Sequence, residues 1–204
     1  MIAIIDYGAG NLFSVKNALD FLKIPNIITS NKEEIESASG IILPGVGAFP
    51  KAMQMLNATG LAEFLKEQTT KKPLLGICLG MQMLFETSYE FEKVAGLGLI
   101  PGEIKPIPNC GLKIPHMGWN NLEITNESSL LQGVKEGEHV YFVHSYMAYT
   151  DKKYISAVAS YGEKITGVVQ NGNVFGTQFH PEKSGEVGLK MLTNFWNLAS
   201  GGAK

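Results

Sequence analysis

The chain has 204 residues, of which 45% are hydrophobic and 18% are charged, with a formal net charge of −2. This balance, without a Lys/Arg block, argues against a nucleic-acid or anionic-membrane surface. The longest apolar run, residues 73–85, is shorter than the roughly 20 residues that span a bilayer, and the N-terminus lacks the basic region of a signal peptide. Two cysteines could form at most one disulfide. We therefore expect one soluble, cytoplasmic, globular domain over residues 1–204.

In the first half of the chain, expected strands and helices alternate. Apolar runs at residues 2–5 and 40–44 are typical of buried strands, and further strands are expected at residues 26–29 and 73–77. Expected helices begin after a cap at Asn11, at a capping box over residues 30–33, near Pro50, before Leu61 and at residues 79–86. Such alternation predicts a doubly wound parallel sheet.

The second half is rich in β-branched and aromatic residues. Strands are expected at residues 139–146, 154–160, 167–170 and 173–179, with Asn171-Gly172 as a hairpin turn between the last two. A final helix is expected to begin after Ser184 and to end at Gly201-Gly202, with one apolar face. That face comprises Val187, Met191, Phe195 and Leu198. The predicted fold is a flavodoxin-like α/β fold, a doubly wound, mostly parallel sheet with antiparallel edge strands.

Cys78 lies in the sequence Gly76-Ile-Cys-Leu-Gly80, the pattern of a nucleophile elbow with Cys in place of Ser. The flanking glycines permit a sharp strand-to-helix turn. The helix that follows places positive partial charge beside the sulfur, and the N–H of Leu79 is a candidate oxyanion donor. The alternative is a buried structural cysteine, since free Cys is often buried.

His180 is the candidate general base for this nucleophile. It ends an expected strand in the sequence Gln178-Phe-His-Pro-Glu182. Residues two apart in an extended chain point to the same side, so Glu182 can accept from one ring nitrogen while the other faces the thiol. By itself, such a strand end is also typical of a capped loop.

Two glycine-rich loops follow other parallel strands. In Pro44-Gly-Val-Gly47, Val46 or Gly47 could supply a second oxyanion donor, although an ordinary loop would read the same. Gly8-Ala-Gly10 lacks the third glycine of a dinucleotide fingerprint, so no cofactor is expected. No metal site is expected either, because no ligand-spaced cluster is evident. Cys110 is expected to have no role in the chemistry. The other three histidines are expected to be structural or interface residues, namely His116, His139 and His144.

Taken together, the motifs identify a family resemblance. They are Asp6-Tyr-Gly-Ala-Gly-Asn11, Leu43-Pro-Gly-Val-Gly-Ala-Phe49, Gly76-Ile-Cys-Leu-Gly-Met-Gln82, Pro115-His-Met-Gly-Trp-Asn120, Tyr141-Phe-Val-His-Ser-Tyr146 and Gln178-Phe-His-Pro-Glu-Lys-Ser184. The chain resembles class I (triad) glutamine amidotransferases over nearly its full length. Within them it is most similar to the glutaminase subunits of imidazole glycerol phosphate synthase.

The resemblance implies hydrolysis of L-glutamine to glutamate and ammonia through a thioester on Cys78, with His180 and Glu182 completing the triad. It implies an oxyanion hole from Leu79 and Val46, the latter after rearrangement of the loop at residues 44–47. The implied glutamine-binding residues are Gly45, Val46, Gly47, Leu79, Gln82, Glu90, Ser145 and Tyr146. Among them, Glu90 would bind the α-amino group of the substrate. Glu92 is the competing carboxylate for that last role.

The resemblance also implies a partner, a (β/α)₈-barrel cyclase subunit that forms a heterodimer with the glutaminase and uses its ammonia in histidine biosynthesis. The residues implied at that interface are Asn11, Met117, Trp119, Tyr141 and Lys183. An exposed Met-Gly-Trp suits an interface core. Burial of Trp119 in this protein's own core is the alternative.

Three other functions remain open from the sequence. The same glutaminase chemistry could supply ammonia to a different synthase, such as a sugar amidotransferase. The chain could be a catalytically silent flavodoxin-like binding module. A free-standing cysteine hydrolase acting on γ-glutamyl compounds is the third, although nothing in the chain resembles a separate lid.

Overall fold

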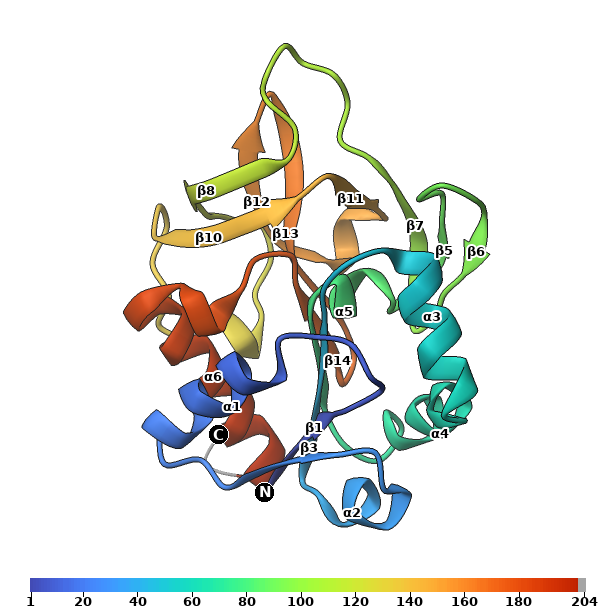
Figure 1. Ribbon diagram of the computed structural model, residues 1–204. Helices are drawn as coiled ribbons and strands as arrows, with labels where there is room; N and C mark the ends of the chain where they lie inside the picture. Colours follow the sequence, from blue (N-terminus) through green and yellow to red (C-terminus); the bar gives the residue numbers. More distant parts are fainter. Residues whose placement is uncertain (202–204) are drawn as a thin grey trace.

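An eight-stranded sheet organises the chain in the computed structural model, which describes residues 1–201 (Figure 1). In spatial order its strands are β2 (Asn26–Thr29), β1 (Ile2–Ile5), β3 (Gly40–Gly45), β4 (Leu74–Cys78), β14 (Val174–Thr177), β13 (Glu163–Asn171), β12 (Ile155–Tyr161) and β9 (Glu123–Ile124). The first five are mutually parallel and the last three are added antiparallel. The predicted fold class is confirmed.

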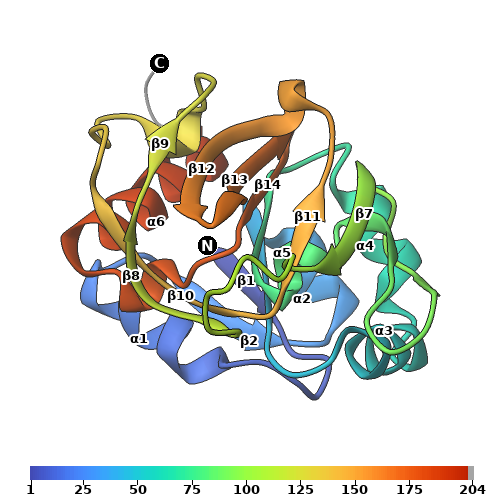
Figure 2. The same ribbon diagram turned by 90° about the horizontal axis from the view of Figure 1, so that it is seen from above.

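Helices cover both faces of the parallel part of this sheet (Figures 1 and 2). One face packs against α1 (Leu12–Phe21) and α6 (Gly185–Ser200). The other packs against α2 (Lys32–Ser37), α3 (Phe49–Ala58) and α4 (Leu61–Gln68). Strands β1, β3 and β4 are buried along their whole length because apolar side chains meet helices on both sides, which explains their unbroken apolar sequences.

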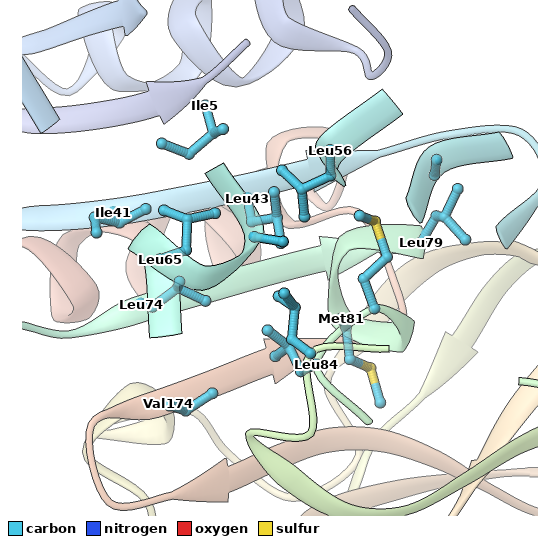
Figure 3. Packing of buried hydrophobic residues seen from close by; sticks show 14 of the residues in the cluster. Ile5, Ile41, Leu43, Leu56, Leu65, Leu74, Leu79, Met81, Leu84 and Val174 are labelled. Carbon is cyan, nitrogen blue, oxygen red and sulfur yellow. The ribbon is translucent and has the colours of Figure 1, made fainter. Parts of the chain in front are cut away.

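Figure 3 shows the core on the second of these faces. Leu56 of α3 and Leu65 of α4 lie over Leu43 and Leu74 of the sheet, and all four are fully buried. Met81 and Leu84, which follow the end of β4, extend the same cluster beneath the end of the sheet. Burial of each such side chain stabilises the fold by about 1.5–3 kcal/mol.

Two smaller sheets lie beyond the main one. A two-stranded sheet pairs β8 (His116–Asn121) with β10 (His139–His144), and a four-stranded sheet has the order β11 (Tyr146–Tyr149), β7 (Ile100–Pro106), β5 (Phe85–Ser88), β6 (Val94–Ala95). The expected strand at residues 139–146 is therefore broken at Ser145, where the chain passes from one small sheet to the other. Three single turns of 3₁₀ helix complete the described residues: η1 (Ser129–Leu131), η2 (Lys152–Tyr154) and η3 (Pro181–Lys183).

The helix expected at residues 79–86 is wrong in length. The helix α5 (Leu79–Gln82) is a single turn, and Phe85 already belongs to strand β5. The carbonyls of Met83 and Leu84 accept hydrogen bonds from the N–H groups of Leu97 and Leu99. Pairing with a segment some fifteen residues away thus overrides the local helical pattern.

Details of three helices also differ from expectation. Asn31 rather than Ser30 caps α2, its side chain accepting from Glu34 N–H at 3.0 Å. Asn11 occupies the cap position of α1 without a side-chain hydrogen bond. On α6, Met191 and Phe195 are buried as expected, but Leu198 is exposed, and Gly188 and Leu192 complete the buried face. Gly201 ends that helix in the left-handed conformation, and Gly202 lies outside the described residues.

None of the helices in residues 1–201 combines the length and apolar character needed to cross a bilayer.

Candidate active site

Cys78 is the last residue of β4 and has φ +55°, a positive backbone angle that side-chain-bearing residues rarely adopt. Close packing on both sides sustains this strained turn. A Cβ on Gly80 would lie 1.8 Å from the carbonyl oxygen of Leu43, and one on Gly76 would lie 2.7 Å from that of Gly80. Glycine at both positions therefore lets β3, β4 and α5 pack closely enough to hold the sulfur at the carboxyl edge of the sheet. Such strain is characteristic of functional sites.

His180 and Glu182 form a buried pair. The Nδ1 of His180 lies 2.8 Å from Glu182 Oε1, and their side chains are only 3% and 1% exposed. The expected geometry is wrong in one respect, since residues 181–183 form the turn η3 rather than extended chain. The turn, begun by Pro181, brings the carboxylate back onto the ring that precedes it.

Ser184 fixes the backbone of His180. Its hydroxyl donates to the carbonyl of His180 at 2.6 Å and accepts from the N–H of Tyr141 at 3.0 Å. The N–H of His180 in turn donates to the carbonyl of Tyr141 at 3.0 Å. The side chain of Ser184 therefore makes no capping bond to α6, contrary to the expected cap, and ties the histidine to β10 instead.

The electrostatics around His180 favour its protonated form. Burial acts to lower the pKa of His180, but hydrogen bonds to Cys78 and Glu182 and the negative charges of both outweigh it and raise this pKa to about 9. At pH 7 the ring of His180 is therefore an imidazolium. A thiolate beside an imidazolium is the reactive form of a nucleophilic cysteine.

A cavity of about 340 Å³ opens directly above these groups. It is lined by Val46, Gly47, Cys78, Leu79, Gln82, Glu90, Pro115, Val143, His144, Ser145, Tyr146 and His180. Of the residues expected to bind substrate, all but Gly45 line this cavity. Gly45 lies beneath the elbow, as the register neighbour of Cys78, and a Cβ there would be 2.6 Å from Gly80 N.

Glu90 and Glu92 differ sharply in their surroundings. Glu90 is buried in the cavity wall, and its carboxylate accepts from the N–H of Phe49 at 2.7 Å, at the first turn of α3. Burial raises the pKa of Glu90, while the bond from Phe49 opposes this. Glu92 is exposed and does not line the cavity. The geometry therefore selects Glu90 as the carboxylate that can meet a substrate cation.

Gln178 is a site residue that the sequence argument missed. It is fully buried, its Nε2 lies 3.9 Å from the sulfur of Cys78, and its Oε1 accepts from Gln82 Nε2 at 3.0 Å. Gln82 also donates to the carbonyl of Tyr146 at 3.1 Å. Since Gln82 presents an N–H to Oε1, Gln178 turns its own N–H toward the sulfur. Its place two residues before His180, on the same side of an extended segment, was the available signal.

The expected interface residues Met117, Trp119 and Tyr141 gather on one face of the β8–β10 pair. Met117 and Trp119 are 61% and 57% exposed, so burial of Trp119 in the protein's own core is wrong. Trp119 is the register partner of Tyr141, and their rings meet edge to face at 6.1 Å. Lys183 is exposed on η3, and Asn11 lines a narrow crevice with Glu182 and Val46.

The other histidines and the second cysteine differ in their exposure. Both cysteines are free, and Cys110 is exposed and does not line the cavity. His139 is exposed, whereas His116 and His144 are buried register partners across β8 and β10, a pairing that their sequence spacing did not reveal. Over residues 1–201, no three His, Cys, Asp or Glu side chains converge in a way that would hold a metal ion.

Comparison with known proteins agrees with this geometry. The family model for glutamine amidotransferase class-I matches residues 3–198. The chain is 54% identical over 196 residues to the imidazole glycerol phosphate synthase subunit HisH of Bacillus cereus (strain G9842), covering 96% of this chain and 93% of that protein. The subunit HisH of Bacillus anthracis (strain CDC 684 / NRRL 3495) is 52% identical with the same coverage.

Among solved structures, a crystal structure of glutamine amidotransferase matches with a TM-score of 0.77 at 19% identity, over 98% of this chain and 100% of that one. At this level of identity the match establishes a shared fold. Family and fold are thus supported by independent comparisons. The chain belongs to the class-I glutamine amidotransferase family, within its branch of HisH subunits.

Proposed function

We propose that this chain is the glutaminase subunit of an imidazole glycerol phosphate synthase, a single amidotransferase domain that hydrolyses L-glutamine and delivers the ammonia to a cyclase subunit. One observation carries the glutaminase chemistry: the strained Cys78 faces the His180–Glu182 pair within one cavity of about 340 Å³. The similarity to HisH subunits supports the assignment of the ammonia to histidine biosynthesis. Free cysteines agree with a reducing compartment such as the cytoplasm.

In the first half-reaction, the Cys78 sulfur attacks the side-chain carbonyl carbon of glutamine while His180 holds the former thiol proton on Nε2. The carbonyl electrons move to oxygen, which accepts hydrogen bonds from the N–H groups of Leu79 and Val46. The C–N bond then breaks as Nε2 gives its proton to the departing nitrogen. Ammonia leaves, and a γ-glutamyl thioester remains on the sulfur.

In the second half-reaction, water attacks the thioester carbon. The neutral Nε2 of His180 takes one proton from this water, and the C–S bond breaks with its electron pair passing to sulfur, which restores the thiolate. The new γ-carboxyl group releases the second proton of the water to solvent, and glutamate leaves. Glu182 keeps its hydrogen bond to Nδ1 throughout, so the ring presents the same nitrogen, Nε2, first to the departing ammonia and then to the attacking water. Glu90 recognises the α-ammonium of glutamine by charge and hydrogen bonding.

We place the cyclase partner on the surface formed by Met117, Trp119 and Tyr141, with Lys183 and Asn11 beside it. Large exposed apolar side chains are uncommon on a free strand pair and are typical of interface anchors. This surface adjoins the cavity, because Val143, which lies on strand β10 together with Tyr141, lines the cavity. Ammonia released at Cys78 therefore forms next to the proposed partner.

The test measures glutamate release with and without a cyclase subunit of the same synthase and its substrate. Hydrolysis is expected to be weak in the isolated chain and strongly stimulated in the complex. Cys78→Ala abolishes glutamine-dependent synthesis but leaves ammonia-dependent synthesis intact, and Cys110→Ala, the matched control, changes neither. Loss of both activities in an assembled Cys78→Ala complex, or equal hydrolysis with and without the cyclase, contradicts the proposal.

Labelling separates the other readings. A glutamine-analogue electrophile is expected to modify Cys78 but not Cys110, and excess glutamine blocks the modification. Absence of labelling favours a silent binding module. Labelling without cyclase binding, together with stimulation by a different synthase such as a sugar amidotransferase, assigns the ammonia to that acceptor instead.

A further inference from the structure

Two buried histidines outside the triad form a continuous hydrogen-bonded chain that ends at the cavity wall. The Nδ1 of His116 lies 3.0 Å from the Nε2 of His144, and the Nδ1 of His144 lies 2.8 Å from the carbonyl oxygen of Tyr146. At the other end, the Nε2 of His116 lies 3.2 Å from the amide nitrogen of Asn120. The two rings are 2% and 6% exposed, so water does not substitute for these partners.

The hydrogen bonds that link Asn120, His116, His144 and Tyr146 can run in only one direction. Burial lowers the pKa of His116 to about 4 and that of His144 to about 3, so both rings are neutral at pH 7, each with one donor and one acceptor nitrogen. The Tyr146 carbonyl can only accept, which places the proton of His144 on Nδ1. Its Nε2 must then accept from Nδ1–H of His116, whose Nε2 accepts from Asn120. Both histidines are therefore Nδ1–H tautomers.

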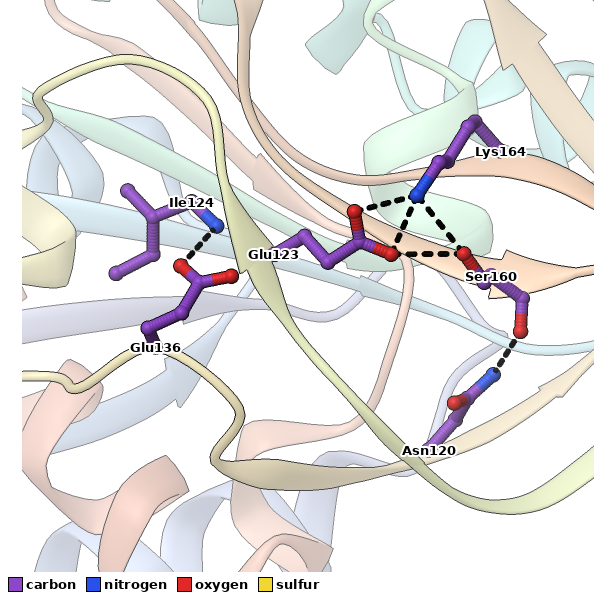
Figure 4. Close-up of polar contacts among 6 residues, drawn as sticks. All are labelled: Asn120, Glu123, Ile124, Glu136, Ser160 and Lys164. Carbon is purple, nitrogen blue, oxygen red and sulfur yellow. Dashed lines mark hydrogen bonds and ion pairs between the residues drawn. The ribbon is translucent and has the colours of Figure 1, made fainter.

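The outer end of the chain is anchored in the main sheet, as Figure 4 shows. The amide of Asn120 also donates to the carbonyl of Ser160 on β12 at 3.0 Å, which fixes the amide orientation. The hydroxyl of Ser160 donates to Glu123 at 2.7 Å, and Lys164 pairs with Glu123. The ring of His116 is further clamped between Phe142 and Tyr161, whose centroids lie 4.6 and 4.1 Å away.

The inner end of the chain meets the catalytic hydrogen bonds at a single atom. The carbonyl oxygen of Tyr146 accepts both from His144 and from Gln82, and Gln82 continues through Gln178 to the sulfur of Cys78. Tyr146 begins β11 directly after the break at Ser145 and pairs with Pro106 of β7, and the carbonyl of Ser145 accepts from the N–H of Ile107 at 2.9 Å. The two histidines thus add side-chain hydrogen bonds to a stretch of the cavity wall where the backbone passes from one small sheet to the other.

We infer that His116 and His144 are positioning residues for glutamine, holding the Ser145–Tyr146 wall in place through a hydrogen-bonded chain of fixed direction. This inference rests on the proposed glutaminase function. His144 also lines the cavity, but the inferred effect of both rings passes through the Tyr146 carbonyl and not through contact with substrate. Removal of the terminal hydrogen bond is expected to weaken glutamine binding more than it slows bond breaking.

Two amide substitutions at position 144 separate this role from packing. In His144→Asn the side-chain nitrogen takes the place of Nδ1 and still donates to Tyr146, whereas in His144→Gln the amide reaches only the former Nε2 position. In the complex with the cyclase, His144→Gln is expected to raise KM for glutamine about 3- to 10-fold, the range for loss of one neutral hydrogen bond. Its kcat stays within about threefold of that of the parent. His144→Asn recovers most of the loss in KM, and the exposed His139→Asn is the matched control.

His116→Phe tests the outer link, because phenylalanine keeps the stacking on Phe142 and Tyr161 but cannot donate to His144. It is expected to raise KM as His144→Gln does. Equal KM values for His144→Gln, His144→Asn and the parent overturn the inference, as does an equal rise in both variants, which indicates packing alone.

A spectroscopic measurement keeps the inference testable if the chain proves not to hydrolyse glutamine. Two-bond ¹H–¹⁵N correlations of the histidine rings at pH 7 are expected to show His116 and His144 as single Nδ1–H tautomers. In His116→Phe, His144 is expected to lose this single tautomer. An Nε2–H tautomer at either ring in the parent overturns the chain itself. Absence of glutaminase activity with intact tautomers overturns only the proposed function.

Discussion

Glu182→Gln is the most informative change to the proposed triad, since it removes one charge while keeping the size of the side chain. The difference between the ordinary pKa of 6.5 and about 9 for His180 corresponds to about 3 kcal/mol of preference for the imidazolium. Cys78 and Glu182 both contribute to it against the cost of burial. If Glu182 supplies roughly half, its loss lowers the pKa of His180 by about one unit. An amide at this position can also select the wrong ring tautomer.

The assay is glutamate release by the complex between pH 6 and 10. At pH 7 we expect kcat to fall by at least about 30-fold, and by up to the roughly 10⁴-fold seen when a triad carboxylate becomes an amide. The alkaline limb of the profile, where the imidazolium loses its proton, moves about one pH unit lower. Glu186→Gln, an exposed acid in the first turn of α6, is the matched control and should leave both features unchanged.

The same change affects stability in a defined pH window. Because folding raises the pKa of His180, its ion pairing stabilises the fold fully below pH 6.5, and this contribution is lost as pH rises through about 9. The deficit of Glu182→Gln in unfolding free energy is therefore largest near pH 6 and shrinks above pH 9. A variant with kcat within threefold of the parent at every pH and an unmoved alkaline limb would refute the orienting role of Glu182.

Three further predictions follow from the described geometry. Glu90→Gln raises KM for glutamine about 10- to 100-fold, as expected for loss of a charged hydrogen bond, whereas Glu92→Gln stays near the parent; equal effects would contradict the choice of Glu90. Gly80→Ala is expected to lower the unfolding free energy by about 3 kcal/mol or more in urea unfolding, because the new Cβ has no room. In the control Gly98→Ala, where φ is +65° and the space is open, the unfolding free energy falls by about 1 kcal/mol. Similar losses in the two variants would refute the packing argument. His116 and His144 stay neutral in the folded protein but gain protons in the unfolded chain below pH 6.5. The unfolding free energy is therefore expected to fall by about 2 kcal/mol for each ring between pH 7 and pH 5. His144→Asn should lose less unfolding free energy than the parent over this range.

The parallel half of the fold could be predicted because its strands are buried on both faces. Strands β1, β3 and β4 carry unbroken apolar sequences, and glycine-rich loops follow at their carboxyl ends. Since parallel strands end at the same edge, Cys78 and the loop at residues 44–47 had to lie close together. The parallel pairing of β14 with β4, which brings His180 to the same edge, was not predicted, because the strand before His180 was expected only as part of an antiparallel hairpin.

The segment between residues 85 and 124 was not predictable in this way. Its strands are short and find their partners far along the chain, as β5 does on β7 and β8 on β10. The contact between His116 and His144 depends on the register of that second pair, which local pattern does not encode. Gln178 was missed for a related reason, because its role requires the position of Gln82, a residue on a different element.

The loop at residues 44–47 is anchored at one end and unconfined at the other. Gly45 sits against Gly80 so tightly that neither can be displaced without moving the elbow, whereas Gly47 has φ +95° and no neighbour within 4 Å of its Cβ position. Rearrangement of the loop beyond the Cα of Gly45, including the peptide that carries the N–H of Val46, therefore leaves the sulfur of Cys78 where it is. The fold mechanically separates a stationary nucleophile from an adjustable hydrogen-bond donor, so the readiness of the site can change without any movement of its most strained residue.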